Sequence, residues 1–286
     1  MGLDNIICAI CGDEGTGKTT MAITFPKPLR HFDVDVGGFR RAIWRLEKAG
    51  EAEGIESKGY PRPIQMGKLM GTQGSPSTRI AVPKKVEGMK ELWQQIVTDF
   101  VAACMDAEVK TIVIDSATLL WNICHSSHLE ELQERQLARH KAKNPNRPFD
   151  ENDYRERLQP MEYGPANDRM RTILHTARSY QKNLVLAHYP TDEYGMIPDS
   201  KGTMVEGKTG KRIIDGFKET KKLVDLVVWT SIKETTNAGV TEKQPVCKIT
   251  KCGLEGAGLA AVGLEVPASY DGIVNKVNLL KGAANA

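Results

Sequence analysis

The chain has 286 residues, and its 39 lysine and arginine residues exceed its 36 aspartate and glutamate residues by a net charge of +3. Hydrophobic residues make up 40% and charged residues 26%, which is ordinary globular usage and excludes a disordered chain, a collagen-like repeat and a coiled coil. Because the net charge is small, any contact with nucleic acid must come from a local basic patch.

The sequence also limits where the protein acts. No apolar run approaches the roughly 18 residues that a membrane span needs, and the amino terminus lacks the basic region of a secretion signal. The six cysteines show no framework spacing, as expected of reduced thiols. Cys8 and Cys11 form a C-x-x-C pair, but residues three apart in a strand point to opposite faces, which does not favour a metal site. We expect a cytoplasmic protein with no membrane partner.

The amino-terminal part begins with a predicted strand over residues 6–11, a glycine-rich loop and a short helix that Pro26 stops. A second strand is predicted over 29–36. Residues 37–88 are rich in Gly, Pro, Ser and Lys, and we expect a loop-rich insertion with one short helix over 42–48.

The middle of the chain alternates helices and strands. An apolar stripe predicts a helix over 87–105, and the β-branched run 111–114 is typical of a strand buried on both faces. A helix to about residue 134 comes next. Residues 139–164 form a predicted long loop, followed by a helix over 167–181.

A strand over 183–187 ends at His188, and a second long polar segment, 189–217, precedes strands over 223–230 and 246–250. This alternation predicts an α/β fold with a mainly parallel central sheet flanked by helices and with long mobile loops.

Residues 12–19 fit the pattern G-x-x-x-x-G-K-[ST], placed between a predicted strand and a predicted helix as a phosphate loop requires. We expect Lys18 to reach the β- and γ-phosphates of ATP and the Thr19 hydroxyl group to bind Mg²⁺. The alternative is a glycine turn with an exposed lysine. The residues expected to bind the nucleotide are Gly12, Asp13, Glu14, Gly15, Thr16, Gly17, Lys18, Thr19 and Thr20.

Asp115 follows four β-branched residues, the position of a Walker-B aspartate at the carboxyl end of a buried strand. We expect it to bind Mg²⁺. The alternative is an aspartate that caps the next helix, a role that Ser116 fills equally well.

Hydrolysis also needs a carboxylate that orients or deprotonates water. Asp35 is the first candidate, Asp33 the second and Glu14 the third, against the alternative of a solvated loop aspartate. His188 ends its strand where a side chain can contact the γ-phosphate. The alternative for His188 is a partly buried histidine with a backbone partner.

The order of these parts resembles the RecA-fold recombinase core: a phosphate loop, an acidic strand end with Gly-Gly, Thr-Ile-Val-Ile-Asp-Ser, Asn-Leu-Val-Leu-Ala-His and a late Lys-Ile-Thr-Lys strand. The chain resembles more closely the compact phage P-loop nucleotide-binding proteins that include the Sak-type single-strand annealing recombinases. The resemblance spans residues 6–251, and we expect a RecA-like ATPase core over 1–253 with an unassigned Gly/Ala-rich segment over 254–286.

The resemblance implies a role for each matching residue. Gly12, Gly17, Lys18 and Thr19 bind ATP and Mg²⁺, and Asp115 is the Walker-B residue. Asp35 falls near the catalytic glutamate of that family, and His188 stands where recombinases usually have glutamine. The strand that supplies lysines across a subunit boundary resembles residues 248–253, which places Lys251 as a catalytic residue although a further lysine usual in the family is absent.

In that fold, two mobile loops bind single-stranded DNA, and the two long polar segments lie in their places. The basic residues expected to contact DNA are Arg139, Lys141, Lys143 and Arg147 in the first and Lys201, Lys208, Lys211 and Arg212 in the second. Tyr154, Tyr163, Tyr189 and Tyr194 offer stacking surfaces. A single run of charge is more often a solvated face, but two runs in matching places favour DNA.

The favoured hypothesis is therefore an ATP-hydrolysing recombinase or annealing protein of a phage, acting in the host cytoplasm. The resemblance implies single-stranded DNA, further copies of the chain in a ring or filament and a single-strand-binding protein as partners. The alternatives are a helicase- or packaging-type motor, an ATP-gated DNA-binding assembly factor with little hydrolysis, and a small-molecule kinase.

Overall fold

A central sheet organises the computed structural model, which describes residues 5–63, 68–70, 79–81, 83–198, 200, 202–237, 240–254 and 257–284. Within these residues the sheet has eight strands in the order β12-β11-β10-β1-β7-β6-β2-β3. Its strands are β1 (Ile7–Gly12), β2 (Leu29–Asp33), β3 (Ile55–Gly59), β6 (Thr111–Asp115), β7 (Asn183–His188), β10 (Leu226–Asn237), β11 (Val240–Cys252) and β12 (Glu265–Pro267).

The sheet is mainly parallel, as the sequence predicts. Strands β10, β1, β7, β6, β2 and β3 all pair in parallel, whereas β11 runs antiparallel to β10 and β12 antiparallel to β11. The strands β1, β6 and β7 are buried along their whole length, because helices cover both faces. The predicted α/β fold, with a mainly parallel central sheet flanked by helices, is confirmed.

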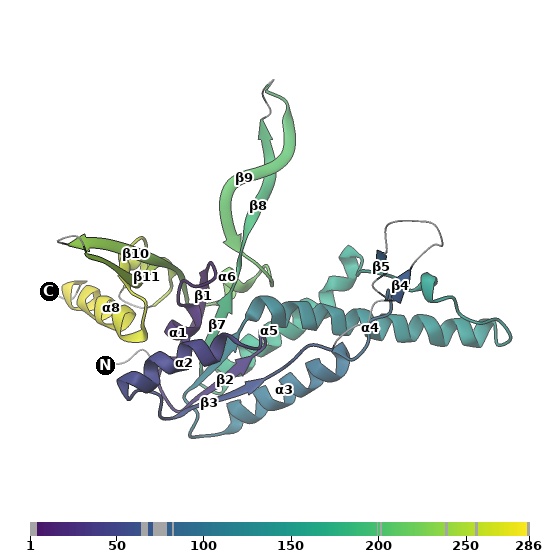
Figure 1. The fold of residues 1–286 in the computed structure, drawn as a ribbon, viewed down its shortest axis with the longest axis horizontal. Helices are drawn as coiled ribbons and strands as arrows, with labels where there is room; N and C mark the ends of the chain where they lie inside the picture. The colour runs from purple at the N-terminus through teal and green to yellow at the C-terminus, as the bar shows by residue number, and fades with distance from the viewer. Residues whose placement is uncertain are drawn as a thin grey trace.

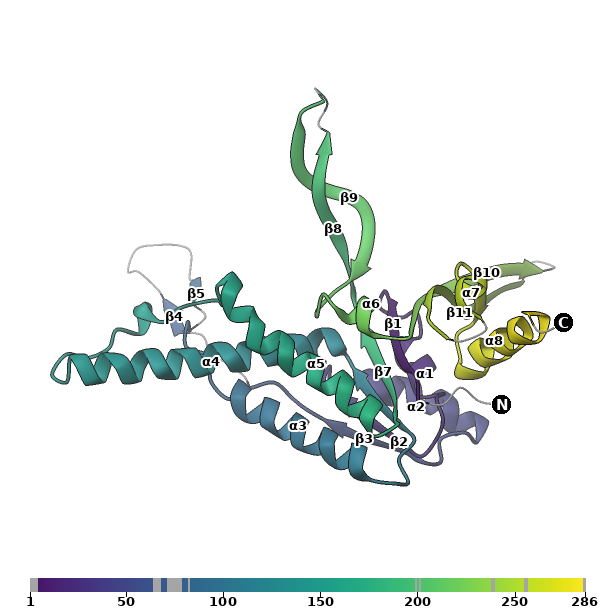
Figure 2. The same cartoon turned by 180° about the vertical axis from the view of Figure 1, so that it is seen from behind.

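Helices cover both faces of the sheet (Figures 1 and 2), and a hydrophobic cluster fills the space between sheet and helices on each face. On one face Ile7 and Ala9 of β1 pack with α3 (Met89–Met105), α4 (Ala117–Lys143) and α5 (Tyr163–Ser179). On the other face Cys8 and Ile10 pack with α1 (Lys18–Ala22) and α8 (Tyr270–Ala284). The alternation along β1 follows from the two-residue period of a strand. The helix α2 (Gly38–Ala49) packs its buried Ala42 and Leu46 against Ile23.

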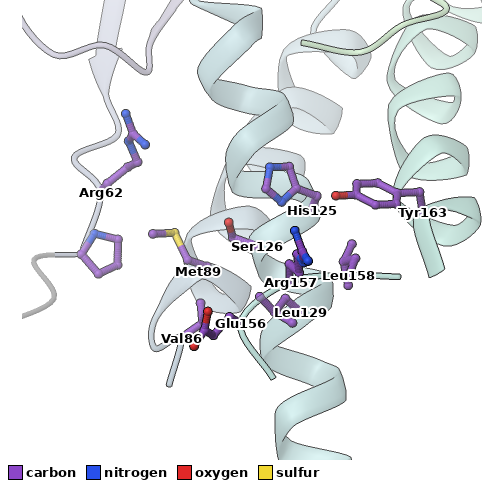
Figure 3. A pocket seen from close by; sticks show the side chains of 11 residues that line it. Arg62, Val86, Met89, His125, Ser126, Leu129, Glu156, Arg157, Leu158 and Tyr163 are labelled. Atoms are coloured by element: carbon purple, nitrogen blue, oxygen red, sulfur yellow. The ribbon is translucent and has the colours of Figure 1, made fainter. Parts of the chain in front are cut away.

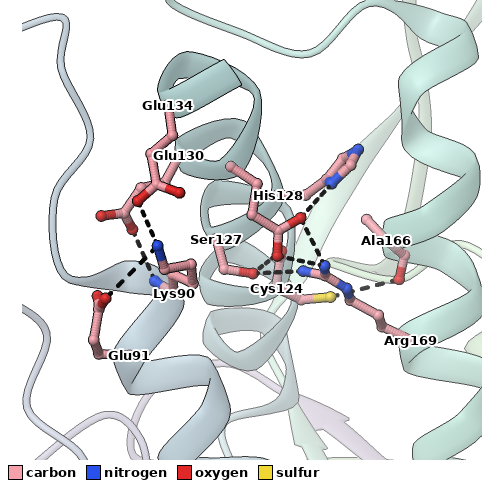
Figure 4. Close-up of polar contacts among 10 residues, drawn as sticks. Lys90, Glu91, Cys124, Ser127, His128, Glu130, Glu134, Ala166 and Arg169 are labelled. Carbon is pink, nitrogen blue, oxygen red and sulfur yellow. Dashed lines mark hydrogen bonds and ion pairs between the residues drawn. The ribbon is translucent and has the colours of Figure 1, made fainter. Parts of the chain in front are cut away.

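Polar side chains join the three helices of the first face (Figure 4). The carboxylate group of Glu130 accepts hydrogen bonds from the backbone N–H groups of Gly88 and Lys90, both at 2.8 Å, and so caps the start of α3. On α5, the guanidinium group of Arg169 donates to Glu131 at 2.7 Å and to Ser127 at 2.9 Å. These contacts fix α3 and α5 to the middle of α4.

The prediction of a long loop over 139–164 was wrong at both ends. The helix α4 continues to Lys143, since the run from Glu134 to Lys143 consists mostly of strong helix formers. Arg139, Lys141 and Lys143 therefore lie on a helix. Two short 3₁₀ turns, Glu151–Asp153 and Pro160–Glu162, follow before α5 begins at Tyr163.

The prediction of a loop over 189–217 was also wrong, because this segment is a β-hairpin. The strands β8 (Pro190–Pro198) and β9 (Met204–Ile214) pair in an antiparallel ribbon that projects away from the central sheet (Figures 1 and 2). We call β8 and β9 the arm. Most of β9 is exposed, so the hydrophobic alternation that reveals a half-buried strand is missing from its sequence. Lys201 lies outside the described residues.

The carboxyl-terminal segment adds to the core. Val266 of β12 and Ile273 and Val277 of α8 are buried in the second hydrophobic cluster. The remaining described elements are β4 (Lys68–Met70), β5 (Arg79–Ala81), α6 (Thr220–Leu223) and α7 (Gly258–Ala261). Among the described residues, no helix is long and apolar enough to cross a membrane.

Candidate nucleotide-binding site

The predicted phosphate loop lies at the carboxyl end of β1 and leads into α1. Gly17 has φ +90°, in the left-handed region that favours glycine. A Cβ atom at Gly12 would lie 2.2 Å from the Thr230 hydroxyl oxygen of β10. The Thr230 hydroxyl group in turn hydrogen bonds to that of Thr16 at 2.8 Å. The loop thus needs its two motif glycines and is braced by the neighbouring strand.

The ammonium group of Lys18 is folded back onto the loop. It donates hydrogen bonds of 2.8 Å to the backbone carbonyl groups of Gly12 and Asp13 and lies 4.7 Å from the ring centroid of Tyr189. Burial lowers the pKa of Lys18, while the charge of Asp115 opposes that shift. A desolvated ammonium group held this close to the loop is suited to bind phosphate oxygens.

Asp115 faces the phosphate loop from the end of β6. Its carboxylate group is buried and accepts a hydrogen bond from the Thr19 hydroxyl group, and its Oδ2 lies 3.7 Å from Nε2 of His31. Burial raises the pKa of Asp115, but the contacts with His31 and Thr19 outweigh it and hold the pKa below its usual value. Ser116 supplies the helix cap, since its hydroxyl oxygen accepts from the N–H of Leu119 at 3.3 Å.

Thr19 and Asp115 provide oxygen donors of the kind that Mg²⁺ prefers. A Cβ atom at Gly38 would lie 3.4 Å from the Thr19 hydroxyl oxygen and 4.0 Å from Oδ2 of Asp115, so the glycine keeps this place open. Among the described residues, no three His, Cys, Asp or Glu side chains gather as a metal site. A magnesium ion here would rely on nucleotide phosphates and water for its other ligands, as Mg²⁺ commonly does.

The three candidate carboxylates lie in different surroundings. Asp33, paired in register with Asp115 at the ends of β2 and β6, is buried, and its Oδ2 accepts from the N–H of Gly37 at 3.2 Å. Asp35 is exposed and accepts a hydrogen bond from the Tyr189 hydroxyl group. Glu14 is exposed on the phosphate loop. Asp35 is thus held at the site by a contact that can open, whereas Asp33 fixes the loop before α2.

We expect Asp35→Asn to bind ATP normally and to hydrolyse it about a hundredfold more slowly, the lower end of what a positioned acid–base group contributes. Asparagine keeps an acceptor for Tyr189 but cannot take a proton from water. Single-turnover hydrolysis and equilibrium ATP binding separate the two steps. Asp33→Asn is the matched variant, and normal turnover in the Asp35 variant together with slow turnover in the Asp33 variant moves the role to Asp33.

His188 is fully buried at the end of β7. Its Nδ1 donates to the backbone carbonyl of Asp215 at 3.0 Å, while its Nε2 has no partner among the described residues. Burial lowers the pKa of His188 to about 4, so the ring is neutral at pH 7. The next residue, Tyr189, donates its N–H to the Thr118 hydroxyl oxygen at 3.1 Å. His188 therefore joins the sheet to the root of the arm.

The other predicted site residues lie on the arm, on β11 and at or just after the end of α4. Arg212 of the arm pairs with Asp13 of the phosphate loop at 2.7 Å, and Lys208 pairs with Asp192 at 2.6 Å. The structure does not bring Lys251 to the phosphate loop of its own chain. Its ammonium group donates to the carbonyls of Lys221 at 2.8 Å and Lys222 at 3.2 Å and so caps α6. The exposed residues Arg139, Lys141, Lys143 and Arg147 form no ion pair within the described part of the chain.

Sequence reasoning missed three contributors. His31 contacts Asp115, Tyr189 covers Lys18, and Thr230 braces the loop. His31 is also held by the Ser57 hydroxyl group, 2.9 Å from Nδ1. Each comes from the end or the inside of a strand that neighbours β1 or β6, so only the strand order and register place it. The signal available in the sequence was a polar residue within an apolar run.

The phosphate loop follows β1, the strand that lies between β10 and β7, and the buried Asp115 faces Thr19 of this loop. This arrangement defines a P-loop NTPase. The sequence profile described as AAA domain matches residues 4–252, and the chain belongs to this family. A KaiC-like protein of the hyperthermophilic archaeon Pyrococcus horikoshii is a similar solved structure, with 12% identity and a TM-score of 0.43 over 93% of this chain and 86% of that one. No curated protein matches the sequence.

Proposed function

We propose that this P-loop NTPase binds ATP with Mg²⁺, hydrolyses it, and uses it to control binding to single-stranded DNA in annealing or strand exchange, as the resemblance to Sak-type phage recombinases implies. The observation that carries the proposal is the direct contact of the arm with the phosphate loop. Arg212 pairs with Asp13, and Tyr189, at the root of the arm, lies over Lys18.

These contacts connect nucleotide binding to the arm. The triphosphate of ATP is a strong anion that competes with Asp13 for Arg212 and with the Tyr189 ring for Lys18. Tyr189 directly precedes β8 and its carbonyl accepts from the N–H of Asp215 at 2.9 Å, so a shift of Tyr189 moves both strands of the arm together. Binding of ATP and its loss on hydrolysis then set two positions of the arm.

The basic end of α4 supports nucleic acid as the partner. Arg139, Lys141 and Lys143 of α4 and the following Arg147 are exposed and unpaired within the described residues, so they are free to bind phosphate groups. On the arm, Lys208 and Arg212 already have acidic partners. In this proposal ATP must release Arg212 before it can contact a strand. The proposal includes assembly of the chain into a ring or filament and cooperation with a single-strand-binding protein.

The experiment that tests the proposed function measures ATP turnover with and without single-stranded DNA. We expect turnover to rise severalfold with DNA and DNA binding to depend on ATP and to weaken with salt, because phosphate contacts release about 0.7 cation each on single strands. Turnover that ignores DNA contradicts the proposal, and DNA binding without measurable turnover favours the assembly factor.

We expect Arg212→Ala to retain ATP binding but to lose most of the severalfold stimulation of turnover by single-stranded DNA, because the arm no longer contacts Asp13 of the phosphate loop. The matched control is Lys211→Ala, which removes one charge from the neighbouring residue of β9 that forms no ion pair within the described chain. Equal stimulation in both variants and the wild type shows that Arg212 does not couple the two sites.

A further inference from the structure

We propose that a groove along α4, from His125 to Arg139, is the path of the single strand, and that the hollow beside His125 and Tyr163 holds one unstacked base. We call it the α4 groove. It consists of three adjoining hollows, of about 480, 750 and 430 Å³. The first two share Arg157, Leu158 and Tyr163, and the second and third share Arg155. This inference rests on the proposed function and names the surface that serves it.

The charge of the groove is one-sided. Four exposed arginines that line it, Arg62, Arg135, Arg139 and Arg157, form no ion pair within the described residues. The two acids that line it are already paired: Glu156 with Lys84 at 3.0 Å and Glu162 with Arg155 at 2.5 Å. Four uncompensated guanidinium groups along one groove fit a polyanion, because each can bind a phosphate oxygen pair. Arg135 and Arg139 lie one helical turn apart, about 6 Å along the axis, so one extended strand can reach both.

The first hollow has the chemistry of a base pocket. Its lining includes the apolar side chains of Met89, Leu129 and Leu158. Figure 3 shows the guanidinium group of Arg157 and the hydroxyl group of Tyr163 both directed toward His125 at its side. The Tyr163 ring also stacks on Trp121, with centroids 6.3 Å apart and an interplanar angle of 29°. An aromatic surface beside unpaired arginines is the arrangement on which single-stranded nucleic acids stack their bases.

Hydrogen bonds hold the segments that line the α4 groove in place on the helix. The side chain of Gln133, buried on α4, donates to the carbonyl groups of Lys84 and Arg155, both at 2.8 Å, and accepts from the N–H of Val86 at 2.8 Å. Gln136 donates to the carbonyl of Asp153 at 2.8 Å. The segments that carry Val86, Arg155 and Arg157 are thus tied to the helix. A duplex keeps its bases stacked inside and cannot place one on Tyr163, so the groove favours a single strand.

The test measures binding of a fluorescent oligothymidine to the full chain with ATP by anisotropy. We expect Arg62→Ala/Arg157→Ala to weaken binding about tenfold near physiological salt and to reduce the salt slope by about 1.4, two contacts at about 0.7 each. The matched control is Arg41→Ala/Arg45→Ala, which removes the same charge from exposed arginines of α2, a helix apart from the groove (Figure 1), that form no ion pair with any residue the structure describes. ATP binding should stay unchanged in both.

A second measurement locates the base. Tyr163→Ala should weaken binding about tenfold, whereas Tyr163→Phe should bind normally, because stacking needs the ring and not the hydroxyl group. A strand carrying 5-iododeoxyuridine should photocrosslink to the peptide that contains Tyr163. Normal binding in the arginine variant, or crosslinks confined to the arm, overturns the groove and leaves the proposed function intact. Failure of the wild type to bind any single strand overturns both, and preference for a duplex overturns the base pocket.

Discussion

Lys18→Ala is expected to lower ATP affinity about a hundredfold, because a hydrogen bond between charged groups contributes up to about 3 kcal/mol and the lysine offsets the negative charge that the loop gathers. Lys18 is the one ammonium group that the described chain holds against the carbonyl groups of Gly12 and Asp13. Turnover should disappear with binding. Isothermal titration with ATP and Mg²⁺ measures the affinity directly.

The fold should survive this change, because the space that the ammonium group leaves lies beside the exposed residues Asp13 and Glu14, where water can reach the two carbonyl groups. Lys18→Met is the matched variant, since methionine keeps most of the apolar stem and lacks only the charge. Thermal unfolding without nucleotide should be nearly the same for both variants and the wild type. A folded variant with unchanged ATP affinity would falsify the assignment of the phosphate loop.

The parts of the fold that the sequence predicted best are the buried ones. The strands β1, β6 and β7 are continuous apolar runs between polar ends, and such runs have few alternatives to a parallel sheet. The arm was missed because neither of its strands contains a fully buried residue, so the arm needs no apolar alternation. The end of α4 was missed because its charged residues are typical of loops as well as of exposed helices.

The same distinction holds for the site. The phosphate loop is a local motif, and Asp115 follows a run that marks its strand, so the sequence located both. The partners of these residues come from distant parts of the chain: His31 from β2, Tyr189 from the root of the arm and Arg212 from β9. The sequence alone also cannot show whether a basic side chain already forms an ion pair with a carboxylate group of the same chain. Arg212 and Lys208 were counted as DNA contacts, and the structure shows that each already has a carboxylate partner.

Asp115→Asn is expected to slow ATP hydrolysis about a hundredfold to a thousandfold and to remove most of the effect of Mg²⁺ on nucleotide affinity. The side chain is 8% exposed and accepts a hydrogen bond from the hydroxyl group of Thr19, so its charge lies in a nearly dry place, where electrostatic interactions are strongest. Asparagine has the same shape and keeps one acceptor oxygen but carries no charge, so it binds a divalent cation poorly.

The measurement that isolates this role is ATP affinity with and without Mg²⁺. In the Asp115→Asn variant the metal-free affinity should equal or exceed that of the wild type, because a negative charge near the phosphates is gone. The gain on adding Mg²⁺ should be lost. Asp33→Asn is the control for a carboxylate in register with Asp115 on the neighbouring strand, and its Mg²⁺ response should stay normal because Asp33 binds the N–H of Gly37 instead. If the Asp115→Asn variant keeps the wild-type Mg²⁺ response and turnover, the Asp115 carboxylate does not bind the metal ion. The alternative role of Asp115 as a helix cap would not explain the residue either, since Ser116 already caps α4.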